Sequence, residues 1–163
     1  MRTLVSLDSG RTLVPFRGSF DNKTAALAGY IAVKHMGYWA DVLVSEGCAG
    51  ALQQRADAAL SILLQAAGPG VTGATLHAKA IAALKPYGLH PVLSRSVGNR
   101  IGLSDNEGGA LTADSQDTLN PGDTYTLQVG AHDANGGAFA SAMVAVTPKG
   151  CDLLLRSPAP AIS

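Results

Sequence analysis

Two adjacent helical segments lie between two groups of strand-like segments, and this order constrains the fold of the chain most strongly. Over residues 48–67, apolar side chains recur at steps of three and four, which is the spacing of one helix face. Residues 68–70 read Gly-Pro-Gly and end that helix, and Thr72 is a suitable N-cap for a second one. We therefore predict one α+β domain over residues 1–156, followed by a flexible tail over residues 157–163.

The strand-like segments are short, rich in apolar or β-branched residues, and separated by Gly, Pro, Asn and Asp. Side chains alternate between the two faces of a strand, so Gln128 ends a polar face that also carries Thr124 and Thr126. In the following strand the same rule places Ser141 among mostly apolar neighbours. The predicted strands cover residues 3–7, 13–16, 38–44, 92–104, 124–129, 139–146 and 152–155, while residues 25–33 are apolar but ambiguous.

Composition disfavours several classes of function. The 163 residues are 47% hydrophobic, enough for one core of ordinary size, and twelve basic residues balance twelve acidic ones. A net charge of zero disfavours nucleic acid or an anionic membrane as a partner. No apolar run approaches the ~20 residues of a membrane span, and the first eight residues are too polar for a signal peptide, so we predict a cytoplasmic protein. Cys48 and Cys151 lack metal-type spacing and are expected to be free thiols, with a disulfide as the alternative.

Four short motifs occur in order along the chain. They read G-Y-W-A-D at residues 37–41, G-N-R-I-G at 98–102, N-P-G-D-T-Y-T-L-Q-V-G at 120–130 and V-A-V-T-P-K-G at 144–150. Their order and spacing resemble the C-terminal part of the pita-bread-fold metallopeptidases, family M24, which includes methionine and Xaa-Pro aminopeptidases, prolidases and creatinases. The resemblance covers about residues 9–155. It implies a curved, mostly antiparallel sheet with two helices packed on its outer face.

In that family five side chains hold two divalent metal ions, and the resemblance assigns their positions in this chain. The aspartate of the first motif is retained as Asp41, whereas the other four positions carry neutral side chains. Divalent cations of this kind require carboxylate or imidazole ligands, and a pair of them requires bridging carboxylates. We therefore expect no catalytic metal pair, no metal-activated water and no cofactor. The four substituted positions are Tyr30, Asn99, Gln128 and Ser141.

Other cleft positions of the family are also altered. Phe16 and Asn106 stand where the resemblance expects histidines, while the adjacent Glu107 is retained. For Asp41 we expect a structural role, either facing solvent or paired with Arg100. A remnant polar pocket that binds a peptide is the alternative interpretation of this cleft.

The resemblance leaves two classes of function open. The first is a catalytically inactive binding or assembly module, similar to the peptidase-like domain of the large FACT histone-chaperone subunit and to proliferation-associated aminopeptidase homologues. The second is an enzyme, either a metal-dependent aminopeptidase or Xaa-Pro peptidase, or a metal-independent hydrolase resembling creatinase. Creatinase chemistry relies on a histidine in the pocket, and the matching positions here are Asn99 and Asn106. The residues therefore favour the inactive module.

The chain also begins close to a segment that family members precede with several helices and a strand hairpin. The apolar face of a sheet that lacks such a cover is a site of association or aggregation. We therefore expect a protein partner or a second copy of the chain to cover the missing N-terminal half.

Overall fold

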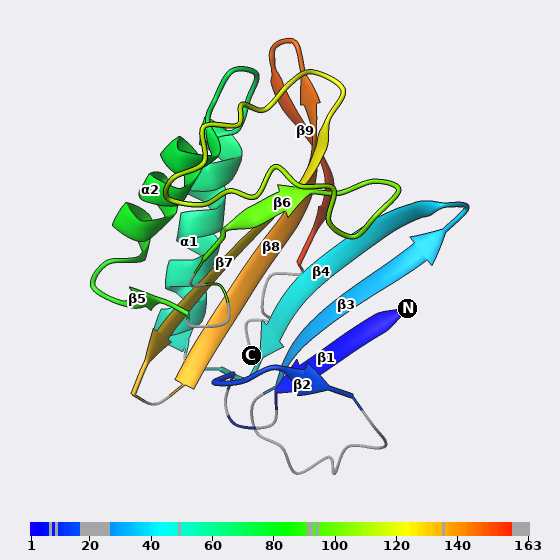
Figure 1. Ribbon diagram of the computed structural model, residues 1–163. Helices are drawn as coiled ribbons and strands as arrows, with labels where there is room; N and C mark the ends of the chain where they lie inside the picture. The colour runs from blue at the N-terminus through cyan, green and yellow to red at the C-terminus, as the bar shows by residue number, and fades with distance from the viewer. Residues whose placement is uncertain are drawn as a thin grey trace.

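The computed structural model describes residues 1–6, 8, 10–16, 27–48, 50–90, 93, 95–134 and 136–157. Within these residues the strands form two sheets in which every paired neighbour is antiparallel. The first has the order β2-β1-β3-β4, and the second has the order β5-β7-β8-β9 with β6 also pairing with β7 (Figure 1). The strands are β1 (Arg2–Ser6), β2 (Val14–Pro15), β3 (Leu27–His35), β4 (Tyr38–Glu46), β5 (Gly88–Leu89), β6 (Gly98–Arg100), β7 (Thr124–Asp133), β8 (Gly136–Thr147) and β9 (Gly150–Arg156).

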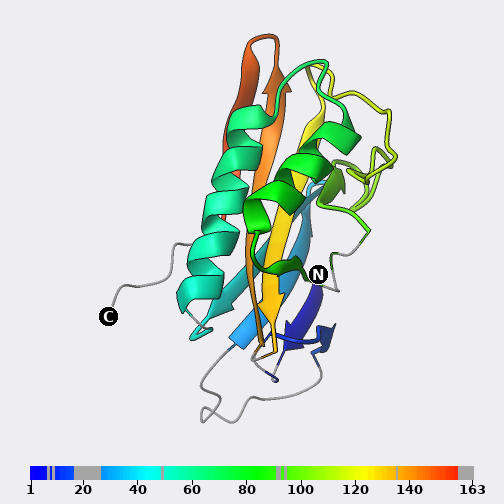
Figure 2. The ribbon, with the colours of Figure 1, turned by 90° about the vertical axis from the view of Figure 1, so that its left-hand side faces the viewer.

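Two helices, α1 (Gly50–Ala66) and α2 (Gly73–Leu84), follow β4 and cover one face of the second sheet. Figures 1 and 2 both show the helices on one side of β7 and β8 and the strands β1, β3 and β4 on the other. The buried stripe of α1 packs against alternate side chains of β7 and β8 because each strand presents every second residue to the helices. This core includes Leu52, Leu60, Leu63, Leu76, Leu84, Leu127, Val129 and Val144.

Serine hydroxyls join the two sheets where β4 passes β8. Ser141 Oγ accepts a hydrogen bond from the Leu43 amide at 2.7 Å and donates to the Leu43 carbonyl at 3.1 Å. Two residues further along each strand the arrangement recurs in the opposite sense: the Phe139 amide of β8 donates to Ser45 Oγ of β4 at 2.8 Å. Serine hydroxyls therefore take the place of backbone-to-backbone hydrogen bonds at this junction. They hold β4 against the face of β7 and β8 that is opposite the helices.

The helix predictions are confirmed. Helix α1 occupies most of the predicted range 48–67, and Thr72 caps α2 by accepting a hydrogen bond from the Thr75 amide at 3.2 Å. The alternation predicted for 124–129 is also confirmed, because Tyr125, Leu127 and Val129 lie in the helix-facing core. Cys48 and Cys151 are free thiols, as expected.

The strand predicted over residues 92–104 is largely wrong. In the described part of that range only Gly98–Arg100 forms a strand, and residues 101–123 fold back as turns whose amides and carbonyls bond to this short strand. Gly98 has a φ of +144°, and a Cβ there would overlap the Thr126 carbonyl, so the backbone needs glycine at that position. Close approach to β7 therefore takes precedence over strand propensity in this segment.

Ser157, the first residue of the predicted tail, is buried and exchanges two hydrogen bonds with the backbone of Ser141. Residues 158–163 lie outside the described residues. Among the helices that are described, none is both long and apolar enough to cross a membrane.

Candidate functional site

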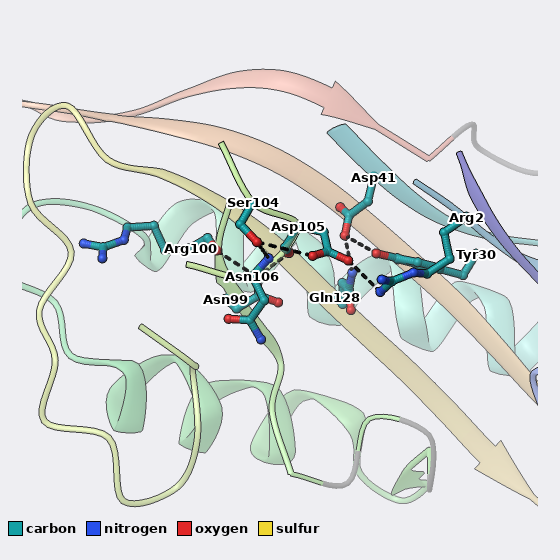
Figure 3. Close-up of polar contacts among 9 residues, drawn as sticks. All are labelled: Arg2, Tyr30, Asp41, Asn99, Arg100, Ser104, Asp105, Asn106 and Gln128. Atoms are coloured by element: carbon teal, nitrogen blue, oxygen red, sulfur yellow. Dashed lines mark hydrogen bonds and ion pairs between the residues drawn. The ribbon is translucent and has the colours of Figure 1, made fainter. Parts of the chain in front are cut away.

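Asp41 is the centre of a hydrogen-bonded group between the two sheets. Tyr30, across the β3–β4 hairpin, donates from its hydroxyl to Asp41 Oδ2 at 3.1 Å. Gln128, from β7, donates from Nε2 to the same oxygen, also at 3.1 Å (Figure 3). The side chains of Tyr30, Asp41 and Gln128 are thus brought together from both sheets.

The environment of Asp41 is poor in compensating charge. The residue is 4% exposed, and its Oδ1 is buried with no hydrogen-bond partner among the described residues. Burial raises the pKa of the carboxyl group above its usual value, hydrogen bonds from Thr126 and Tyr30 oppose that rise, and nearby Asp105 adds to it. No arginine or lysine contacts this carboxylate in the described structure, and the side chain does not face solvent, so both expected settings of Asp41, exposure to solvent and pairing with Arg100, are wrong. Arg100 is paired with Asp123 instead, at 3.8 Å.

Tyr30 acts as a donor and not as an anion. Burial, followed by the neighbouring Asp41 carboxylate, raises the pKa of its phenol far above the usual value. The hydroxyl therefore keeps its proton at neutral pH and points it at Asp41. An ionised phenolate, the form that would bind a divalent cation, is disfavoured by the same two causes.

Arg2 and Asp105 form an ion pair of 2.6 Å beside Tyr30, and neither was predicted as part of the site. Figure 3 places Asp105 between Asn99 and the Asp41 group. Asn99 Nδ2 donates to the carbonyls of Arg100 at 2.8 Å and of Asp105 at 3.1 Å. Asn99 therefore fixes the loop that carries Asp105, and in the described structure it forms no hydrogen bond with Asp41 itself. The sequence held no signal for Arg2, which is about a hundred positions from its partner.

Ser141 pairs with Gln128 in the β7–β8 register but serves the sheet junction. Phe16, Asn106 and Glu107 lie outside the Asp41 group. The Phe16 amide donates to the Thr3 carbonyl at 3.1 Å, and its side chain is 40% exposed. Asn106 Oδ1 accepts from the Gly108 amide at 2.9 Å, and Glu107 Oε1 accepts from the Leu103 amide at 2.6 Å. Both side chains thus stabilise their own loop.

The donor set does not fit a pair of divalent cations. Asp41 supplies one carboxylate, and the side chains around it present an N–H and an O–H toward the position where a cation would require lone pairs. The charge of Asp105 is already balanced by Arg2. Within the described ranges, no group of three or more His, Cys, Asp or Glu side chains is placed to share a metal ion.

Comparisons with known proteins agree with this fold. The family model for "Metallopeptidase family M24" matches residues 27–148. The "Agropine synthesis cyclase" of Rhizobium rhizogenes is 35% identical over 97 residues, which is 59% of this chain and 24% of that protein.

Solved structures match a larger part of the chain at lower identity. The prolidase from Pyrococcus horikoshii OT3 superposes with a TM-score of 0.82 at 16% identity, over 96% of this chain and 48% of that one. The N-terminal domain of the FACT complex subunit SPT16 from Cicer arietinum superposes with a TM-score of 0.71 at 11% identity, over 93% of this chain and 41% of that one. This chain therefore spans less than half the length of these relatives, and the structural matches establish the fold alone.

Proposed function

The chain belongs to metallopeptidase family M24, and from this premise we propose that it is a catalytically inactive member that acts as a binding and assembly module. The observation that supports this most directly is the Tyr30–Asp41–Gln128 group. Two donors already occupy one oxygen of the single carboxylate at the family metal position. A water activated by two metals therefore has no site to form in this cleft.

Hydrolysis of short peptides tests the inactive assignment. We expect no release of N-terminal residues from dipeptides and Xaa-Pro peptides, with or without added manganese or cobalt. Turnover that depends on added metal, and that disappears in Asp41→Asn, would overturn it. A peptide that binds the cleft without being cleaved remains compatible with the proposal.

The assembly role rests on the outer face of the first sheet. Alternation along β3 places Ile31 and Val33 on the face opposite Asp41, and these side chains are 38% and 42% exposed. Val42 and Val44 continue the same face on β4, half-buried. An apolar sheet face of this kind is typical of a protein contact.

We assign this face to a separate protein chain that presents a pair of amphipathic helices. The second sheet shows the kind of cover that such a face takes, since α1 and α2 pack on it. In the part of the chain that the structure describes, a second copy has no free helix pair to offer, because the apolar stripes of α1 and α2 are already buried. A helical partner therefore fits better than self-association.

Two isoleucines with the same exposure make a matched test of this face. Ile31 on the sheet and Ile81 on α2 are each 38% exposed. The partner that co-purifies with the chain should be helical and should be lost with Ile31→Asp and kept with Ile81→Asp. Loss with both variants, or a homodimer by light scattering that Ile31→Asp converts to monomer, would contradict the assignment.

A metal-independent enzyme is the second candidate. The relative that is 35% identical is named a cyclase, and the raised pKa of buried Asp41 suits proton transfer. Metal-free turnover that is lost in Asp41→Asn would favour this candidate. For location we propose the cytoplasm, because the two free thiols are typical of a reducing compartment. Fractionation of cells that express the tagged chain tests this.

A further inference from the structure

A polar cavity lies on the opposite side of β6 and β7 from Asp41. In the register of these strands Asn99 pairs with Thr126, and the next pair, Arg100 with Tyr125, faces the other way. Figure 3 shows the Arg100 side chain pointing away from the Asp41 group. The cavity on that side has a volume of about 350 Å³, and its wall includes Arg100, Gln116, Asp117, Asn120 and Tyr125.

Tyr125 presents an unused hydroxyl to this cavity. The residue is 2% exposed, and no described residue forms a hydrogen bond with its hydroxyl, which borders the cavity. Gly109 keeps that hydroxyl accessible, because a Cβ at this position would lie 3.1 Å from the Tyr125 oxygen. Burial raises the pKa of the phenol, so the group remains a neutral donor and acceptor. The hydroxyl is open to the cavity and is available to a ligand there.

Arg100 supplies a positive charge that its protein partners satisfy only in part. One guanidinium nitrogen donates to the Glu107 carbonyl at 3.0 Å, and another lies 3.8 Å from Asp123, which is a long ion pair. The Arg100 side chain remains 41% exposed. It therefore retains N–H groups for a carboxylate at the mouth of the cavity.

Asp117 supplies a negative charge from a segment that is fixed in place. Its carbonyl accepts from the Gly73 amide at the start of α2 at 3.0 Å, and the Ser115 carbonyl accepts from the Ala74 amide at the same distance. Two further backbone bonds tie Leu119 to residues 70 and 71. This wall of the cavity is therefore built before any ligand arrives, which lowers the entropic cost of binding.

We propose that this cavity binds a small zwitterion, a molecule that carries a carboxylate and an ammonium group a few bonds apart, as a free α-amino acid does. The carboxylate accepts hydrogen bonds from Arg100 and from the Tyr125 hydroxyl, and the ammonium group donates to Asp117. A simple anion is repelled by the carboxylates of Asp117 and Asp123, and a simple cation is repelled by Arg100. A neutral polyol leaves both charges without a counter-charge, so a zwitterion matches the wall best.

NMR titration of the purified chain tests the proposal with defined probes. L-alanine and L-proline should shift the amide resonances of Gly109 and Tyr125, whereas propionate, ethylamine and sorbitol should bind at least about tenfold more weakly because each lacks one charge or both. Equal shifts with sorbitol or with a single-charge analogue would overturn the proposal. If neither L-alanine nor L-proline at 20 mM shifts these resonances, the proposal is also overturned.

Substitutions locate the site and separate it from the cleft. Tyr125→Phe removes only the hydroxyl and should weaken binding about fivefold, and Asp117→Asn, at an exposed position, should weaken it about tenfold. Tyr87→Phe, which removes the hydroxyl of a half-buried tyrosine outside the wall of this cavity, is the control and should leave binding unchanged. Asp41→Asn should also leave binding unchanged because it lies across the sheet, so this result is independent of the proposed inactivity of the cleft. Equal affinity in Tyr125→Phe and Asp117→Asn would refute the site.

Discussion

Gln128 and Asp41 are joined across the two sheets by a hydrogen bond of 3.1 Å from Gln128 Nε2 to Asp41 Oδ2. The amide is the neutral counterpart of the glutamate that the M24 resemblance places at this position. Because the amide donates a hydrogen bond where a glutamate would bring a second negative charge, it stabilises a lone carboxylate without a cation. This contact gives the buried Asp41 carboxylate a neutral hydrogen-bond donor from the second sheet.

Gln128→Glu should therefore destabilise the protein at neutral pH by about 1–3 kcal/mol, since two carboxylates would meet in a partly buried site. Part of the loss should be recovered at lower pH, where one carboxyl group takes up a proton. Urea unfolding at two pH values measures both effects. Gln54→Glu, at an exposed position of α1, is the control and should change stability by less than about 0.5 kcal/mol. An equally stable Gln128→Glu protein would contradict the contact.

At neutral pH the Asp41→Asn variant should be more stable than the wild type. The folded-state pKa of Asp41 is raised, so folding carries a penalty while the carboxyl is ionised in both states. As pH falls through the folded pKa toward the unfolded value of 3.8, the folded wild type binds the proton first and gains stability. The difference between wild type and variant should therefore shift toward the wild type on acidification. A difference that is constant with pH, measured by urea unfolding, would rule this out.

His90 should make the opposite contribution. It is fully buried, its Nε2 lies 2.5 Å from the Gly10 carbonyl, and burial lowers the pKa of its imidazole below 6.5. His132 lowers that pKa further, while the Gly10 contact and Asp8 oppose the change. Above pH 6.5 the ring is neutral in both states and costs nothing, and stability is lost as pH falls below 6.5 because the unfolded chain binds the proton more tightly.

Thermal unfolding between about pH 5 and pH 7 measures this dependence on His90. Its slope should become shallower in His90→Gln, although that variant loses packing and stability at every pH. His35→Gln, at the exposed end of β3, is the control and should retain the wild-type slope. An unchanged slope in His90→Gln would assign the pH dependence to other groups.

Ser141→Ala should cost about 2–3 kcal/mol. The substitution removes both hydrogen bonds to the Leu43 backbone and leaves its buried amide and carbonyl without these partners. Urea unfolding of Ser141→Ala beside Ser61→Ala, a half-buried serine of α1, separates the junction from a general effect of losing a hydroxyl. Equal losses in the two variants would contradict the role of Ser141 as a link between the sheets.

The helices and the polar face of β7 could be predicted because each depends on a local period in the sequence. The spacing of Leu52, Leu60 and Leu63 is enough to predict α1. Alternation along β7 is enough to place Gln128 on the sheet face opposite the helices, where Asp41 lies. The contacts of Asp41 could be predicted only in part, since Arg100 on β6 and Gln128 on β7 face opposite sides of the sheet, and the sequence does not report how these two strands pair.

The Arg2–Asp105 ion pair lay beyond sequence reasoning, because it joins the first strand to a loop about a hundred residues later. Residues 101–104, just before Asp105, were predicted as strand and are not, since glycines such as Gly98 and Gly109 permit backbone conformations that apolar periodicity does not report. Long-range partners and glycine-dependent turns are thus the features that required the structure.

The metal content of the purified protein tests the central claim most directly. After incubation with manganese, cobalt or zinc and exhaustive dialysis, elemental analysis should find far less than one equivalent of each metal per chain, because the Asp41 group lacks the acidic ligands that a metal pair requires. About two tightly held equivalents per chain, lost on Asp41→Asn, would contradict the account.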